Sequence, residues 1–88
     1  MTSDLSGAQQ DTLRILLAGG ATSLETALNA YNLGGPRLNA NVLARLESKG
    51  LTLSKVKGAR GGSRVTHYWL TPAGAERAAA IVASTRAA

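Results

Sequence analysis

The fold is decided by residues 42–74, which read VLARLESKGLTLSKVKGARGGSRVTHYWLTPAG. This stretch begins with the end of a helix, stops at Gly50, and then switches to the alternating pattern of a strand. A break rich in glycine and arginine over residues 58–63 separates two such runs, as in a β-hairpin. Thr71-Pro72 then predicts a capped helix start. We therefore expect a helix, a hairpin and a further helix in this order.

Two more helices are expected before this stretch. Ser6 and Gln9 have the spacing of a capping box, apolar residues follow at helical spacing, and Gly19-Gly20 ends the helix. Thr22 and Glu25 repeat the capping-box spacing. They predict a short second helix that ends near Asn32, and its inward face would carry Leu24, Ala27, Leu28 and Tyr31. A turn with two glycines over residues 33–36 follows, so the pair outlines a helix-turn-helix.

A third helix is expected from about Pro36 to Lys49. At 100° per residue one side collects Leu38, Val42, Leu43 and Leu46. The opposite side carries Arg37, Ala40, Asn41, Ala44 and Ser48, with Arg45 and Lys49 at its flanks, whereas Asn39 falls at the edge of the buried side. Small residues allow a helix to approach base edges, and Asn or Arg can contact adenine or guanine there. The helix alone leaves open that this is an ordinary solvated face.

The hairpin and the last helix complete one small domain. Leu51 and Leu70 are expected in the core, and Trp69 is expected to anchor the hairpin to the helices, while the pattern leaves open which strand face points inward. The last helix should end near Ser84, with Ala75, Ala78, Ile81 and Val82 available to the core. We expect a flexible N-terminus over residues 1–5, a domain over residues 6–83, and a frayed C-terminus over residues 84–88. The expected class is mainly α with a small β-hairpin (α+β), in the order α-α-α-β-β-α.

Charge is the most useful bulk property of this 88-residue chain. Ten Lys and Arg stand against five Asp and Glu, for a formal net charge of +5. Five of the basic residues, and no acidic one, fall between positions 49 and 64. Basic clustering favours a polyanionic partner, most commonly nucleic acid. There is no cysteine and no apolar run of the ~20 residues that span a bilayer, so we expect a cytoplasmic protein without disulfides.

The sequence offers little for catalysis, so we expect no enzyme, no cofactor and no metal site. His67 is the only histidine and has no carboxylate or thiol partner by spacing. The acidic residues are scattered at positions 4, 11, 25, 47 and 76. The glycines at 58, 61 and 62 are not followed by the Lys-Ser/Thr of a nucleotide-binding loop.

Taken together, these residues resemble the winged helix-turn-helix family, in particular bacterial regulators of the MarR and PadR type. The family pattern closes the recognition helix with Leu-Glu, enters the wing with Gly-Leu, bears arginine in the wing loop, and opens the next helix with Leu-Thr-x-x-Gly. Here the corresponding residues are LESKGL at 46–51, Arg60 with Arg64, and LTPAG at 70–74. The resemblance spans about residues 6–83 but not the extra helices with which MarR-type proteins dimerise and sense ligands.

The resemblance implies a DNA-binding transcriptional regulator that reads double-stranded DNA sequence-specifically, such as a stand-alone domain of a phage or another compact genome. The third helix would enter the major groove, and the wing would meet phosphates or the minor groove. The implied contacts are Arg37, Asn41, Arg45 and Lys49 on the helix, and Lys55, Lys57, Arg60 and Arg64 on the wing. A winged-helix module that binds a protein, as an adaptor or an inhibitor of a host complex, remains the alternative. A homodimer also stays open, since half-sites are usually read in pairs.

Overall fold

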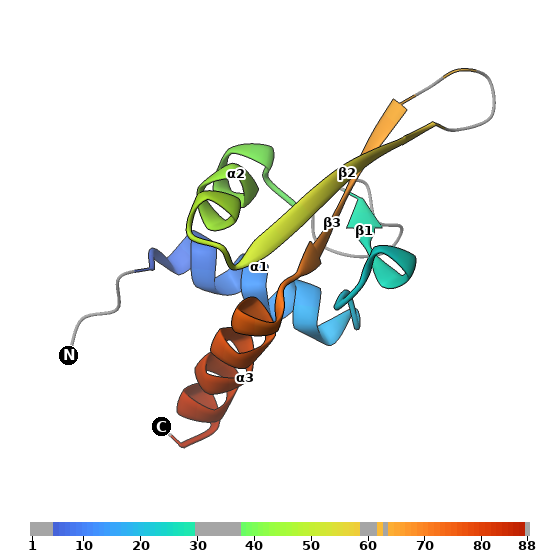
Figure 1. The fold of residues 1–88 in the computed structure, drawn as a ribbon. Coiled ribbons are helices and arrows are strands. Elements are labelled where there is room, and N and C mark those ends of the chain that lie inside the picture. Colours follow the sequence, from blue (N-terminus) through green and yellow to red (C-terminus); the bar gives the residue numbers. More distant parts are fainter. Residues whose placement is uncertain (1–4, 30–37, 59–61, 63, 88) are drawn as a thin grey trace.

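A computed structural model of the chain describes residues 5–29, 38–58, 62 and 64–87. Three α-helices and a three-stranded antiparallel sheet of order β1-β3-β2 make up the described part, which confirms the α+β class. The elements are α1 (Gly7–Ala18), a 3-10 helix η1 (Leu24–Thr26), β1 (Leu28–Asn29), α2 (Ala40–Ser48), β2 (Thr52–Gly58), β3 (Arg64–Leu70) and α3 (Pro72–Ala87). The hairpin β2–β3 extends from the body as an arm, and α3 leaves its base in the other direction (Figure 1).

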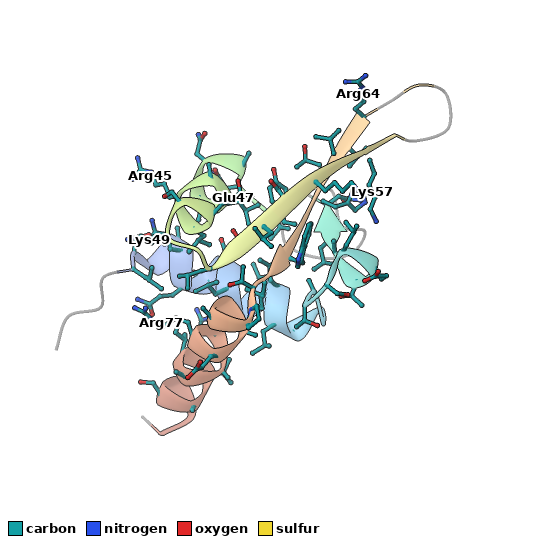
Figure 2. All side chains as sticks on the ribbon, viewed as in Figure 1. Arg45, Glu47, Lys49, Lys57, Arg64 and Arg77 are labelled. Carbon is teal, nitrogen blue, oxygen red and sulfur yellow. The ribbon has the colours of Figure 1, made fainter. Side chains whose placement is uncertain are left out.

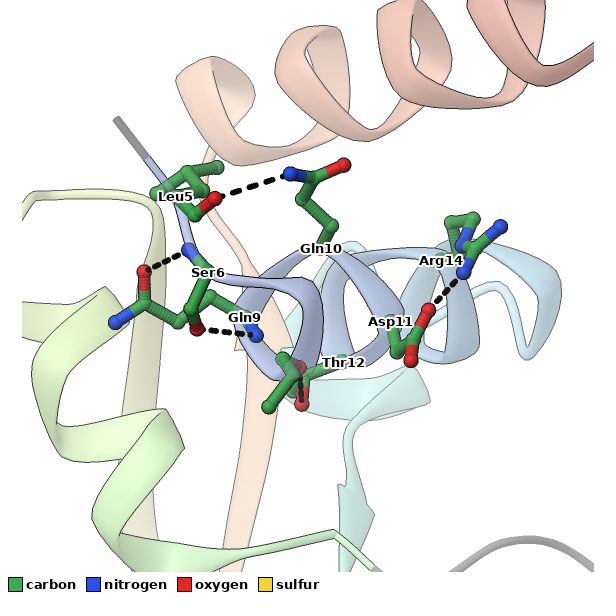
Figure 3. A network of polar contacts seen from close by, with 8 residues as sticks. Leu5, Ser6, Gln9, Gln10, Asp11, Thr12 and Arg14 are labelled. Atoms are coloured by element: carbon green, nitrogen blue, oxygen red, sulfur yellow. Dashed lines mark hydrogen bonds and ion pairs between the residues drawn. The ribbon is translucent and has the colours of Figure 1, made fainter. Parts of the chain in front are cut away.

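The expected capping box starts α1. The Ser6 hydroxyl accepts from the Gln9 amide at 3.2 Å, and the Ser6 amide donates to Gln9 Oε1 at 3.1 Å (Figure 3). Gln10 Nε2 donates to the Leu5 carbonyl at 3.0 Å. Leu5 is only 4% exposed and belongs to the core, so the folded domain begins at least one residue earlier than expected. Residues 1–4 of the expected flexible N-terminus lie outside the described residues.

The prediction of a second α-helix that starts at Thr22 is wrong for the described residues of this segment. The cap forms one residue later, where the Thr26 hydroxyl accepts from the Ser23 amide at 3.1 Å, and only one 3-10 turn follows. The backbone becomes extended at Ala27, and the next two residues pair with Tyr68 and His67 of β3. A single turn is a poor helix nucleus, and the edge of β3 supplies alternative hydrogen-bond partners. The remainder of this prediction, with the helix-turn-helix turn, falls on residues 30–37, outside the described part.

The third helix forms but begins at Ala40 rather than near Pro36. Asn39 is its N-cap, and its Oδ1 accepts from the amides of Asn41 at 2.9 Å and Val42 at 3.3 Å. The helix is closed at its other end by Gly50, which adopts φ +76° as expected of a glycine stop. Its inward side is as predicted, with Leu38, Leu43 and Leu46 buried and Val42 half-buried.

The core lies where α1, α2 and α3 meet the base of the sheet. Its buried apolar residues are Leu5, Leu13, Leu16, Ala21, Leu38, Leu43, Leu46, Leu51, Leu70 and Ala78. The predicted core positions Leu51 and Leu70 are therefore confirmed. Trp69 is half-buried and packs against this cluster, which also confirms that it anchors the hairpin.

A compact joint connects the end of α2 to the start of α3. The Thr71 hydroxyl donates to the Gly50 carbonyl at 2.7 Å and accepts from the Gly74 amide at 3.0 Å. The Thr71 amide donates to the Leu51 carbonyl at 3.1 Å. The predicted Thr-Pro helix start is thus confirmed. The helix runs to Ala87, three residues beyond the expected end at Ser84, in a segment whose alanines and arginine favour helix.

Removing the Thr71 hydroxyl tests this joint. We expect Thr71→Ala to lower the free energy of unfolding by about 1–2 kcal/mol, because both a helix cap and a bond to the preceding turn are lost. Thr71→Ser keeps the hydroxyl and is the matched control, with stability close to wild type. Urea unfolding followed by circular dichroism measures both, and equal midpoints for the two variants would contradict the assignment.

Candidate nucleic-acid interface

The outward side of α2 is an exposed surface of small residues. Ala40, Asn41, Ala44 and Ser48 are all exposed, as predicted, and so are Arg45 and Lys49. Because the Asn39 side chain caps the helix, the first exposed amide side chain within α2 is that of Asn41. The surface therefore offers one amide group beside small residues, with two cations along one flank.

The two flanks of α2 carry opposite charge. Arg45 and Lys49 are four residues apart and share the flank that points away from the hairpin (Figure 2). Glu47 occupies the other flank, and its Oε1 accepts from the Ser54 hydroxyl of β2 at 2.8 Å. The Thr52 hydroxyl also donates to the Leu43 carbonyl at 3.4 Å. These two hydrogen bonds fix α2 against one face of the hairpin.

The hairpin register places Arg64 on the same sheet face as α2. Cross-strand partners share a face, and successive partners alternate. Arg64 pairs with Gly58, and Tyr68 pairs with Ser54, whose hydroxyl binds Glu47 of α2. Within each strand the two residues are four positions apart, which is an even number, so all four residues lie on one face of the hairpin. The exposed Arg64 at the far end of β3 is therefore presented on the α2 side (Figure 2).

Lys55 and Lys57, in contrast, belong to the opposite face. Their register partners are His67 and Val65. Lys57 Nζ donates to the Leu24 carbonyl of η1 at 3.3 Å, and its side chain lies on the side of the hairpin away from α2 (Figure 2). The structure thus separates these two lysines from the cations on α2. Arg37 and Arg60, the other two predicted contacts, lie outside the described residues.

The carboxylate of Glu25 lies near Lys57 and partly offsets its positive charge. A hydrogen bond with its own backbone lowers the pKa of Glu25, and a bond with Ser23 and the charge of Lys57 lower it as well. Glu25 is thus kept ionised close to this lysine. Arg64 is exposed on the α2 side of the sheet. A salt bridge joins Arg14 and Asp11 of α1 (Figure 3).

The described residues contain no group of three or more His, Cys, Asp or Glu side chains that could hold a metal ion. His67 is half-buried, and its Nδ1 lies 3.2 Å from the Val65 carbonyl. The imidazole ring of His67 therefore has a hydrogen-bond partner within its own strand.

Sequence reasoning missed two residues that organise the surface. Asn39 caps α2, and Ser54 holds Glu47 against the hairpin. An asparagine three residues before the apolar Val42 is a typical N-cap signal and could have indicated the cap. Strand alternation placed Ser54 on the same face as Thr52, but only the packing of α2 shows that this face points toward the helix.

Within the described residues, no helix combines the length and the apolar character needed to cross a membrane. No protein-family model, no curated protein and no solved structure matches this chain.

Proposed function

We propose that this chain is a winged-helix transcriptional regulator that binds double-stranded DNA sequence-specifically. In this proposal α2 lies in the major groove, and the hairpin is the wing on phosphates or the adjacent minor groove. The observation that carries it is the exposed side of α2, where Asn41 and small residues are flanked by Arg45 and Lys49 while Arg64 lies on the same side of the sheet.

The dimensions of α2 suit this role. A helix with its side chains is about 10–12 Å across, and the major groove is about 12 Å wide. Nine residues correspond to about 13 Å of helix, enough for contacts to a few successive base pairs. Ala40 and Ala44 add little bulk on the outward side, so Asn41 could reach an adenine edge with two hydrogen bonds.

Fluorescence anisotropy with labelled duplexes tests DNA binding directly. The logarithm of the association constant should fall linearly with the logarithm of salt concentration, by roughly 0.9 for each phosphate contacted. Selection from random duplexes should then enrich one sequence. Absence of binding at low salt contradicts the proposal, and binding without any enriched sequence contradicts the specific regulator. An enriched palindrome together with a dimer mass in solution would establish a homodimer.

Asn41 is the residue on which sequence reading should depend most. We expect Asn41→Ala to relax the preference at one base pair by about 1–3 kcal/mol while leaving the salt dependence unchanged. Ser48→Ala is the control on the same exposed side, and its hydroxyl bonds to the Arg45 carbonyl within the helix. Competition titrations with single-base variants of the selected site measure both. An unchanged preference in Asn41→Ala would exclude this residue from base reading.

One observation favours a second candidate, a module that binds a protein. Leu53 and Val56 are 45% and 53% exposed, and both lie on β2, which pairs only with β3 among the described strands. An exposed strand edge with apolar side chains can accept a strand from another chain. Nuclease-treated binding assays with wild type and a Leu53→Ser/Val56→Ser variant separate the two candidates. A partner that survives nuclease and is lost in the variant would favour the module.

A further inference from the structure

A further cation, Arg77 of α3, lies on the side of the molecule that carries Arg45 and Lys49 (Figure 2). Its position follows from the joint between α2 and α3. The Gly50 carbonyl accepts from Thr71, and Gly74 packs directly on the backbone of Leu51. Arg77 follows Gly74 by three residues and is therefore on the neighbouring part of the same helix face. The first turns of α3 are thus held beside the chain that continues from Lys49.

We propose that Lys49 and Arg77 form a second phosphate contact, on the side of α2 opposite the hairpin. This inference rests on the proposed function, because it requires α2 to occupy the major groove. The major groove is bordered by one sugar-phosphate backbone on each side, and a helix nearly fills its width. Arg64 serves one backbone, and the pair Lys49 and Arg77 serves the other. The duplex is then contacted on both sides of the groove. In this arrangement α3 takes part in binding in addition to α2 and the β2–β3 hairpin.

The character of Arg77 suits a phosphate contact. Its side chain is half-buried on α3. A planar guanidinium can bind a phosphate through two parallel hydrogen bonds. Two residues from different elements, fixed to each other through the backbone contacts at Gly50 and Leu51, would present a preformed contact. Contacts to phosphate position the duplex and carry no sequence preference of their own.

Arg77→Met is the appropriate variant, because methionine retains an apolar stem and removes the charge. Arg14→Met is its matched control, since Arg14 is also a half-buried arginine on a helix, paired with Asp11 on α1. We expect Arg77→Met to lower the salt slope by roughly 0.9 and the affinity roughly eightfold at 0.1 M salt. Arg14→Met should match wild type, and Arg77→Lys should recover the slope. Thermal unfolding of each variant checks that binding is compared between folded proteins.

Hydroxyl-radical footprinting on the selected duplex, with each strand labelled in turn, locates the contact. Wild type should protect both backbones that border the groove. Arg77→Met should lose protection on one backbone only, and Arg64→Gln on the other. Protection of both backbones together with an unchanged salt slope in Arg77→Met would overturn the inference, as would wild-type protection confined to one backbone. Both results leave DNA binding intact, whereas failure of wild type to bind any duplex is failure of the proposed function itself.

Discussion

Gly74→Ala is expected to unfold the protein or leave it with little residual stability. A Cβ atom at this position would overlap the carbonyl oxygen of Leu51 and lie 2.8 Å from its carbonyl carbon. Both obstacles are backbone atoms, so no side-chain rotation relieves them. Overpacking of this kind costs about 3 kcal/mol or more, which is a large part of the 5–15 kcal/mol that stabilises a typical domain. The variant should melt at least about 12 °C below wild type.

Gly7→Ala is the matched control for this substitution. Gly7 is also in the first turn of a helix, and a Cβ there would meet no atom within 4 Å. We expect this variant to be as stable as wild type or slightly more stable, because alanine restricts the unfolded chain. Calorimetry or thermal circular dichroism measures both proteins. Equal melting temperatures for the two variants would show that α3 does not pack on Leu51 as described.

The largest effect on DNA binding is expected from removing one cation of α2 together with one of β3. Arg45 and Arg64 are exposed, and both lie on the α2 side of the sheet. If each contacts one phosphate, Arg45→Gln/Arg64→Gln lowers the salt slope by roughly 1.8 and the affinity roughly 60-fold at 0.1 M salt. Anisotropy titrations over a range of salt concentrations give both quantities.

The control for this pair is Lys55→Gln/Lys57→Gln. Each double variant removes two positive charges, so the formal net charge falls from +5 to +3 in both. The lysines lie on the opposite face of the hairpin, and Lys57 already donates to the Leu24 carbonyl. We therefore expect the lysine pair to change affinity far less than the arginine pair. Equal losses would mean that affinity follows net charge alone, which contradicts a binding surface on the α2 side.

Local signals in the sequence predicted the elements that depend on neighbouring residues. The Ser6–Gln9 capping box, the stop at Gly50 and the Thr71 helix start are all present in the structure. The hydrogen bond that caps or ends each helix lies within a few residues of that position, so a sequence pattern is sufficient to identify it. The exposed side of α2 was predictable for a similar reason, because helical periodicity separates it from the leucines that enter the core.

Prediction failed where a distant segment competes with a local one. Thr22 and Glu25 suggested a helix, yet Leu28 and Asn29 pair with Tyr68 and His67, about forty positions later in the chain. The sequence around Thr22 shows the capping signal but not the edge of β3, which offers this segment strand pairing instead of a helix. A short segment that gains strand pairing and packs the half-buried Leu28 against the core need not follow its local helical preference.

The sequence by itself determined the α+β class, the hairpin, the helix starts at Ser6 and Thr71, and the side of α2 that faces solvent, since all of these follow from periodicity and local hydrogen bonding. Only the tertiary structure decided how the basic residues are distributed. Strand alternation separates Lys55 and Lys57 from Arg64, but the contact between Glu47 and Ser54 determines which of the two faces lies beside α2. The joint at Gly50 and Gly74 likewise brings Arg77 to the side of Lys49. Packing between elements, rather than any pattern along the chain, selects the cations that can act together.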